Sequence, residues 1–179
     1  MNFLITEKEG INYSKISGDY NKVHLDNLVG YNSIFGEKIC HGCYVVTKFL
    51  KLLKLDKKLS LEKNFSLIIT FLKHFKYNHK IKILKKKNIY YLYQNKTVLS
   101  EIKIILNNEN KILTIDKSIK FVKKKKIISK NPSLSEMLNT ISKYVGMNFP
   151  GKNSLIRKIE ISSKHNKNIL KKKKFNLFI

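Results

Sequence analysis

Alanine is absent from this sequence of 179 residues, and Arg157 is its single arginine. Lysine therefore supplies almost all of the basic charge behind the formal net charge of +25, in a composition also rich in isoleucine and asparagine. The bias runs through the whole chain, whereas a dedicated nucleic-acid surface would more often use arginine for bidentate contacts. Nucleic-acid binding thus ranks below the other functions considered, although the charge would attract an acidic, phosphate-bearing substrate.

Long hydrophobic runs and cysteine-rich patterns are also missing. The stretch "FSLIITFL" is short and "YVVTKFLKLLKL" is interrupted by lysines, so neither matches the roughly 18 apolar residues of a membrane span. The first residues do not form the basic and then apolar pattern of a secretory signal. Two cysteines cannot form a disulfide framework, and in a reducing cytosol their default state is two free thiols. These absences predict a cytoplasmic protein without membrane association.

The hydrophobic periodicity predicts one helix followed by a sheet. Four glycines punctuate the first 40 residues, for which we expect mostly loops. Apolar residues at helical spacing then predict a helix from Cys43 to Leu53, with one buried side. Alternating or β-branched segments at 65–71, 81–83, 89–94 and 98–106 predict antiparallel strands, with a last strand expected at 118–122. This order predicts an α+β fold in which a helix packs on one sheet.

The remainder of the chain predicts a partial second unit. Residues 126–132 form a basic linker, and residues 133–147 predict a helix opened by Ser133, with Glu136 three residues later. Residues 152–168 then echo 63–78, because both stretches begin with Lys-Asn and continue through Ser-Leu-Ile. We interpret 133–179 as a truncated second repeat beside a first domain at 1–125, and expect 1–130 to fold without it.

A polar loop carries the first residues with catalytic potential. In "SGDYNKVHLD", Asp19 and His24 lie five residues apart, near glycine and asparagine and away from any expected helix face. Such a pair can converge as general acid and base. The alternative is turn chemistry, since Asp and Asn favour turns in any surface loop.

A Cys-x-x-Cys pattern follows in "ICHGCYVV" and admits a redox or a metal interpretation. A thioredoxin-type dithiol should follow a core strand in a βαβ unit, but here a polar loop precedes it. A zinc site needs two further ligands at suitable spacing, which the remaining histidines do not provide. We therefore expect Cys40 and Cys43 to be small residues that flank His41 and Gly42, and we predict neither a metal nor a redox cofactor.

Together, "SGDYNKVHLD" and "FGEKICHG" resemble the signature of the MaoC-like dehydratases, the hydratase branch of the hotdog-fold superfamily. The resemblance covers residues 3 to about 122. The chain departs from the family pattern where Lys22 and Lys38 replace prolines, and where His74, Asn78 and His79 stand in place of a proline and a Gly-Asp turn. The matching positions are Ser17, Gly18, Asp19, Asn21, His24 and Asp26, then Phe35, Gly36, Ile39, His41 and Gly42.

The resemblance implies a hotdog sheet wrapped around a long central helix, here about Gly42 to Leu55, with Asp19 and His24 as the catalytic pair. It implies that the backbone N–H of Gly42 polarises the substrate carbonyl from a helix N-terminus. With Gly42, the residues Asn21 and His41 make up the expected oxyanion and substrate-binding set. Asn21 would orient the loop or the reacting water, and His41 would cap or brace the helix start.

The activity implied is that of an acyl-thioester hydro-lyase of fatty acid metabolism. It would hydrate trans-2-enoyl-CoA or dehydrate (R)-3-hydroxyacyl-CoA, or the same acyl groups on an acyl-carrier protein (ACP). A homodimer or larger even oligomer is expected, with Asp19 and His24 at the subunit junction. The alternative is a non-catalytic acyl-thioester-binding or scaffolding subunit.

Overall fold

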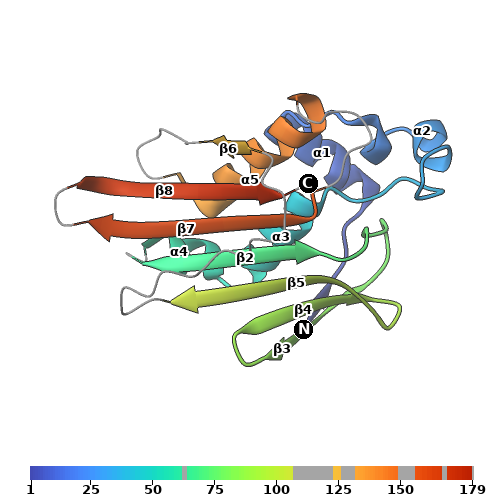
Figure 1. The fold of residues 1–179 in the computed structure, drawn as a ribbon. Helices are drawn as coiled ribbons and strands as arrows, with labels where there is room; N and C mark the ends of the chain where they lie inside the picture. The colour runs from blue at the N-terminus through green and yellow to red at the C-terminus, as the bar shows by residue number, and fades with distance from the viewer. Residues whose placement is uncertain (62–63, 107–122, 126–131, 149–155, 167–168, 179) are drawn as a thin grey trace.

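Helices cover one face of an antiparallel sheet in this protein (Figure 1). The structure, a computed structural model, describes residues 1–61, 64–106, 123–125, 132–148, 156–166 and 169–178. Its eight strands form one sheet in the order β1-β3-β4-β5-β2-β7-β8-β6. The strands are β1 Asn2–Phe3, β2 Phe65–Phe71, β3 Ile81–Lys86, β4 Ile89–Gln94, β5 Thr97–Leu106, β6 Lys123–Lys125, β7 Lys158–Asn166 and β8 Ile169–Phe178. The α+β class with an antiparallel sheet is confirmed.

The strands β2 to β5 lie where the alternation predicted them. On β2, Phe65, Leu67 and Ile69 are fully buried, which is the consequence of a two-residue period with one face on the core. Asn95 and Lys96 both have positive φ between β4 and β5, as a tight type I′ hairpin requires. The strand expected at 118–122 lies outside the described residues.

The expectation of loops over the first 40 residues is wrong, because helix α1 spans Glu7–Ser17. A capping box opens it, in which the side chains of Thr6 and Glu9 each accept a hydrogen bond from the other's backbone N–H. Gly18 ends it in the left-handed conformation. The short helices η1 Lys22–His24 and α2 Asn27–Tyr31 follow.

The predicted central helix begins at Gly42, as expected, but is shorter. Helix α3 spans Gly42–Leu52, and Lys54 adopts a positive φ before α4 Leu55–Leu61. The apolar spacing from Cys43 to Leu53 thus fits α3 closely, whereas the central helix to Leu55 that the resemblance implies is too long. On α3, Val45, Val46, Phe49 and Leu50 are fully buried.

The C-terminal elements join the same sheet and the same core. Helix α5, Leu134–Lys143, starts at the predicted Ser133–Glu136 capping box and packs against α3, and η2 Tyr144–Asn148 extends it. Strand β7 pairs with β2 from Phe65 to Thr70. Lys123–Lys125 pair with β8, whereas linker residues 126–131 lie outside the described residues. The two strands that carry the sequence echo are therefore neighbours, and a second repeat remains a prediction.

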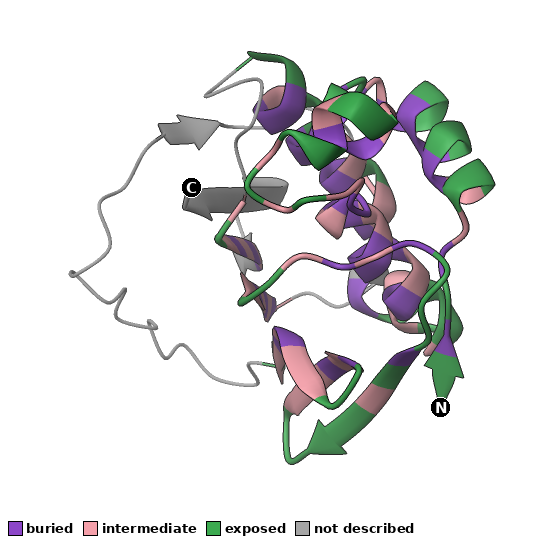
Figure 2. Ribbon diagram, turned by 90° about the vertical axis from the view of Figure 1, so that its right-hand side faces the viewer, coloured by how far each residue is buried: buried purple, intermediate pink, exposed green. Residues whose placement is uncertain are grey.

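The core lies between the sheet and the helices, and both parts of the chain contribute to it. Figure 2 shows buried positions on both the helices and the strands, and exposed positions on the outer side of the helices. In the part of the chain that the structure describes, no helix is both long and apolar enough to cross a membrane.

Candidate active site

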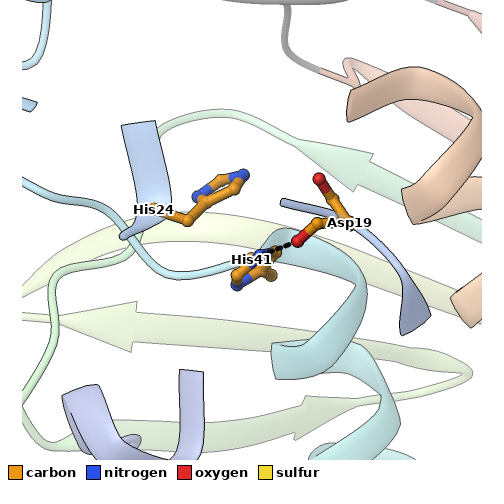
Figure 3. Close-up of side chains that lie close together, drawn as sticks. All are labelled: Asp19, His24 and His41. Carbon is orange, nitrogen blue, oxygen red and sulfur yellow. Dashed lines mark hydrogen bonds between the residues drawn. The ribbon is translucent and has the colours of Figure 1, made fainter. Parts of the chain in front are cut away.

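Two loops and the start of α3 bring three predicted residues together. Asp19 follows the end of α1, His24 ends η1, and His41 immediately precedes α3. One ligand atom from each lies within 4.8 Å of those of the other two. Figure 3 shows the ring of His24 over that of His41, with Asp19 beside them, and the two ring centroids lie 3.9 Å apart.

His24 is oriented by a hydrogen bond from its Nδ1 to the carbonyl oxygen of Ile39, at 2.9 Å. Because a carbonyl only accepts, Nδ1 carries the proton and Nε2 retains a free lone pair. Burial lowers the pKa of His24, against the opposing effects of Asp19 and of the Ile39 carbonyl. The neutral imidazole is therefore the form present near pH 7, and its Nε2 can accept a proton.

Asp19 is almost completely buried, and each of its carboxylate oxygens accepts a hydrogen bond. Oδ1 accepts from the backbone N–H of Asn21 at 3.2 Å, and Oδ2 accepts from the hydroxyl of Ser142 at 2.6 Å. The Asn21 N–H is a local donor and follows from the turn after Gly18. Ser142 belongs to α5 and lies 123 residues after Asp19 in the sequence.

The two polar atoms of the Asn21 side-chain amide differ in their hydrogen bonding. Its Oδ1 accepts from the backbone N–H of Val23 at 3.3 Å and so caps η1. Among the described residues, its buried Nδ2 has no hydrogen-bond partner. A donor left unpaired beside a cavity is available to a bound water or substrate.

His41 braces the site, but it does not cap the helix, which corrects half of the expectation for this residue. Its side chain makes no capping bond to α3. Instead, its Nε2 lies 3.2 Å from Oγ of Ser14 and 3.3 Å from the carbonyl oxygen of Asp19, so it links α1 to the Asp19 loop. Burial and the neighbouring His24 lower its pKa well below the usual range, so it is neutral.

Gly42 opens α3 at the wall of a cavity of about 550 Å³. As the first residue of the helix, its N–H has no acceptor within the helix. A Cβ at this position would lie 3.0 Å from Cε1 of Phe71, so the absence of a side chain leaves room for the Phe71 ring beside the start of the helix. The predicted Asp19, Asn21 and His24 line the same cavity, whereas His41, expected among the substrate-binding residues, does not.

The C-terminal part of the chain supplies lining residues that sequence reasoning missed. The echo between 63–78 and 152–168 was the only signal that this segment belonged with the first unit, and it does not indicate a cavity. The missed residues of this part are Ser142, Val145, Gly146, Ile156 and Arg157. Three lining residues at and after the end of β2 were also missed: Phe71 and Phe75 add apolar surface, and Lys73 adds a cation.

Cys40 and Cys43 are free and buried beside this cavity. Burial raises the pKa of both thiols, so both stay protonated, which disfavours a thiolate nucleophile or zinc ligand. Asp19, His24 and His41 form the one cluster, among the described residues, whose atoms could hold a metal ion. An ion would have to use the remaining ring nitrogens, because His24 Nδ1 and His41 Nε2 already contact backbone carbonyls.

The geometry defines a class of site: a buried carboxylate and a neutral imidazole beside a cavity, at the N-terminus of a helix. No family model matches this sequence. A stretch of 43 residues is 35% identical to Protein MaoC of Klebsiella aerogenes, and it spans 24% of this chain and 13% of that protein. This local similarity confirms the resemblance to the MaoC-like family, over a small part of the relative's length.

Several solved structures are also similar to this chain. An (R)-hydratase from A. caviae involved in PHA biosynthesis has a TM-score of 0.45 and 14% identity, over 58% of this chain and 88% of that one. The R-hydratase PhaJ1 from Pseudomonas aeruginosa has a TM-score of 0.38 and 17% identity, over 65% and 88%. The full-length peroxisomal multifunctional enzyme type 2 from Drosophila melanogaster has a TM-score of 0.43 and 8% identity, over 99% and 47%.

Proposed function

We propose that the protein is an acyl-thioester hydro-lyase of the hotdog type. It would add water reversibly to a trans-2-enoyl thioester and form an (R)-3-hydroxyacyl thioester, carried on CoA or an acyl-carrier protein. The observation that carries the proposal is the placement of Asp19, His24 and Gly42 around one cavity. Those three groups provide a carboxylate, a neutral base and a helix N-terminal donor, which conjugate addition of water requires.

The proposed reaction begins with a water molecule held between Asp19 and Nε2 of His24. One of these groups removes a proton while the water oxygen bonds to C3 of the substrate. The displaced electron pair moves to the carbonyl oxygen, where the Gly42 N–H and the positive end of α3 stabilise the developing charge. Return of a proton to C2 completes the addition of one H₂O. Nδ2 of Asn21 is the donor that would hold the water oxygen.

The cavity supports a substrate with an apolar acyl group and an anionic carrier. Phe71, Phe75, Val145 and Ile156 are among the residues of its apolar surface. Lys73 and Arg157 also line it and are exposed, so they can face phosphate groups. No metal or redox cofactor enters the proposed reaction.

The departures from the family pattern favour a second candidate, a non-catalytic acyl-thioester-binding subunit. Lys22 and Lys38 replace prolines that would restrict the loop backbone. In the absence of these prolines, two other contacts hold the loop. Lys38 forms an ion pair with Glu7 at 2.6 Å, and Ile39 N–H donates to the Val23 carbonyl at 3.3 Å. Binding of an acyl thioester without turnover would select this second function.

An even oligomer and a cytoplasmic location remain part of the proposal. We propose an interface away from Asp19, in place of the subunit junction at Asp19 and His24 expected from the resemblance, because Ser142 and Gly146 of the same chain cover Asp19. Exposed apolar side chains are available elsewhere for such a contact, among them Ile11, Ile16, Leu28 and Tyr31.

The proposal is tested by following the absorbance of crotonyl-CoA, which falls as the conjugated thioester is hydrated. Asp19→Asn and His24→Ala should each lower kcat by about a hundredfold or more, the usual scale for loss of a general acid or base. His79→Ala is the matched control, because His79 is exposed and does not line the cavity. Wild-type protein that binds crotonyl-CoA without hydrating it would contradict the enzymatic function.

A further inference from the structure

The end of α5 lies directly on Asp19. Ser142 is buried, with 4% of its surface exposed, and donates its hydroxyl to Oδ2 of Asp19 at 2.6 Å. Both residues line the cavity. A buried carboxylate oxygen that accepts a short hydrogen bond is held in one orientation, since loss of that donor would leave it unsatisfied.

Gly146 closes the other side of the carboxylate. A Cβ added to Gly146 would lie 2.6 Å from Cγ of Asp19, and closer still to Oδ1. A side chain at this position would therefore displace Asp19 or η2. The Asp19 carboxylate is thus fixed on two sides: the Ser142 hydroxyl donates to Oδ2, and the backbone of Gly146 packs against Oδ1.

We infer that Ser142 is a positioning residue for Asp19, and that α5, η2 and residues 156–157 complete the active site from within the same chain. This inference rests on the proposed hydration. With Oδ1 bonded to Asn21 N–H and Oδ2 bonded to Ser142, the plane of the carboxylate is set relative to Nε2 of His24. Precise placement matters because a misplacement of about 1 Å costs on the order of a hundredfold in rate.

The chain contains a matched control on the same helix. Ser135 donates its hydroxyl to Oδ2 of Asp56 at 2.9 Å, so it also forms a serine–aspartate bond between α5 and an earlier element. Neither Ser135 nor Asp56 lines the cavity. A purely structural role for such bonds predicts the same result for loss of either serine.

The kinetic test compares Ser142→Ala with Ser135→Ala on crotonyl-CoA. Ser142→Ala should lower kcat on the order of 10- to 100-fold with little change in KM, because the lost contact acts on the transition state. Ser142→Thr keeps the hydroxyl and should restore most of the rate, whereas Ser135→Ala should keep the wild-type kcat. Equal kcat values for Ser142→Ala and Ser135→Ala would overturn the positioning role.

A second measurement does not depend on activity. The thermal midpoints of Asp19→Asn, Ser142→Ala and the double variant should be non-additive, as expected for two residues in direct contact. Additive shifts would overturn the contact itself. Non-additive shifts in a protein that never hydrates crotonyl-CoA would instead contradict the proposed function and leave the contact intact. Gly146→Ala, which displaces Asp19 without removing the hydroxyl, should also lower kcat.

Discussion

At the scale of single residues, the protonation state of the site follows from burial. His24 and His41 lie 3.9 Å apart, centroid to centroid, and burial lowers the pKa of both imidazoles. Two adjacent imidazolium ions would repel one another in a site with little access to water. The pair therefore stays neutral near pH 7, which leaves Nε2 of His24 able to act as a base.

These shifts predict acid-dependent destabilisation. In the unfolded chain, both histidines bind protons at an ordinary pKa near 6.5, whereas in the folded chain they bind them only at lower pH. Below pH 6.5 the unfolded state thus binds more protons than the folded state. As the pH is lowered, the free energy of unfolding therefore decreases by up to about 1.4 kcal/mol per pH unit for each histidine. Urea unfolding of wild-type protein between pH 7 and pH 5 should show this slope.

His41→Gln is the variant that tests the assignment, because it removes one of the two lowered titrations. It should lower stability at pH 7 through the loss of the bond to Ser14, but its slope between pH 7 and pH 5 should be shallower than that of wild type. A variant with the full wild-type slope would show that His41 does not titrate below its unfolded value.

At the scale of elements, the sheet was predictable because its pattern is local. The two-residue alternation of β2 and the turn residues after β4 each act within a few residues. Helix α1 was missed because Gly10 suggested a loop. In the folded protein Gly10 is inside the helix, where an added Cβ would overlap the ring of Tyr77. The Thr6–Glu9 capping box was the available signal, and the long-range contact that requires glycine has no local signature.

The residues of the candidate site likewise divide into those with a local sequence signal and those without one. Asp19, Asn21, His24 and Gly42 lie within 24 residues of one another, so two adjacent motifs were enough to predict them. Ser142 and Gly146 reach Asp19 only because α5 packs on α3, and that contact depends on tertiary structure. A serine in an amphipathic helix carries no sign of its partner.

The packing of α5 argues against the expectation that residues 1–130 fold alone. Leu134, Met137, Leu138 and Ile141 are fully buried. Removal of 133–179 would expose their partners on α3 and leave one edge of β2 without β7. We therefore expect residues 1–130 to lack a cooperative thermal transition and to aggregate, as measured by circular dichroism and size-exclusion chromatography. A monomeric fragment with a sharp transition would restore the two-domain interpretation.

At the scale of the whole molecule, one sheet spans both parts of the chain. Strand β2 lies at the boundary, with β5 on one edge and β7 on the other. The two helix–strand units, α3 with β2 and α5 with β7, therefore meet both within the sheet and between the helices. This pairing buries Asp19 to 3% exposure without a second copy of the chain.

The location of the site within one chain predicts that activity does not depend on assembly. If the protein forms a homodimer or larger even oligomer, dilution should dissociate it without loss of specific activity, because Ser142, Gly146 and the proposed catalytic pair belong to the same chain. Sedimentation velocity gives the assembly state across a concentration series, and crotonyl-CoA hydration gives the rate per chain. A rate that falls in step with the oligomer fraction would place part of the site on a partner. In that case the contact between α5 and Asp19 would not be sufficient for catalysis, and the interface would lie closer to the cavity than proposed.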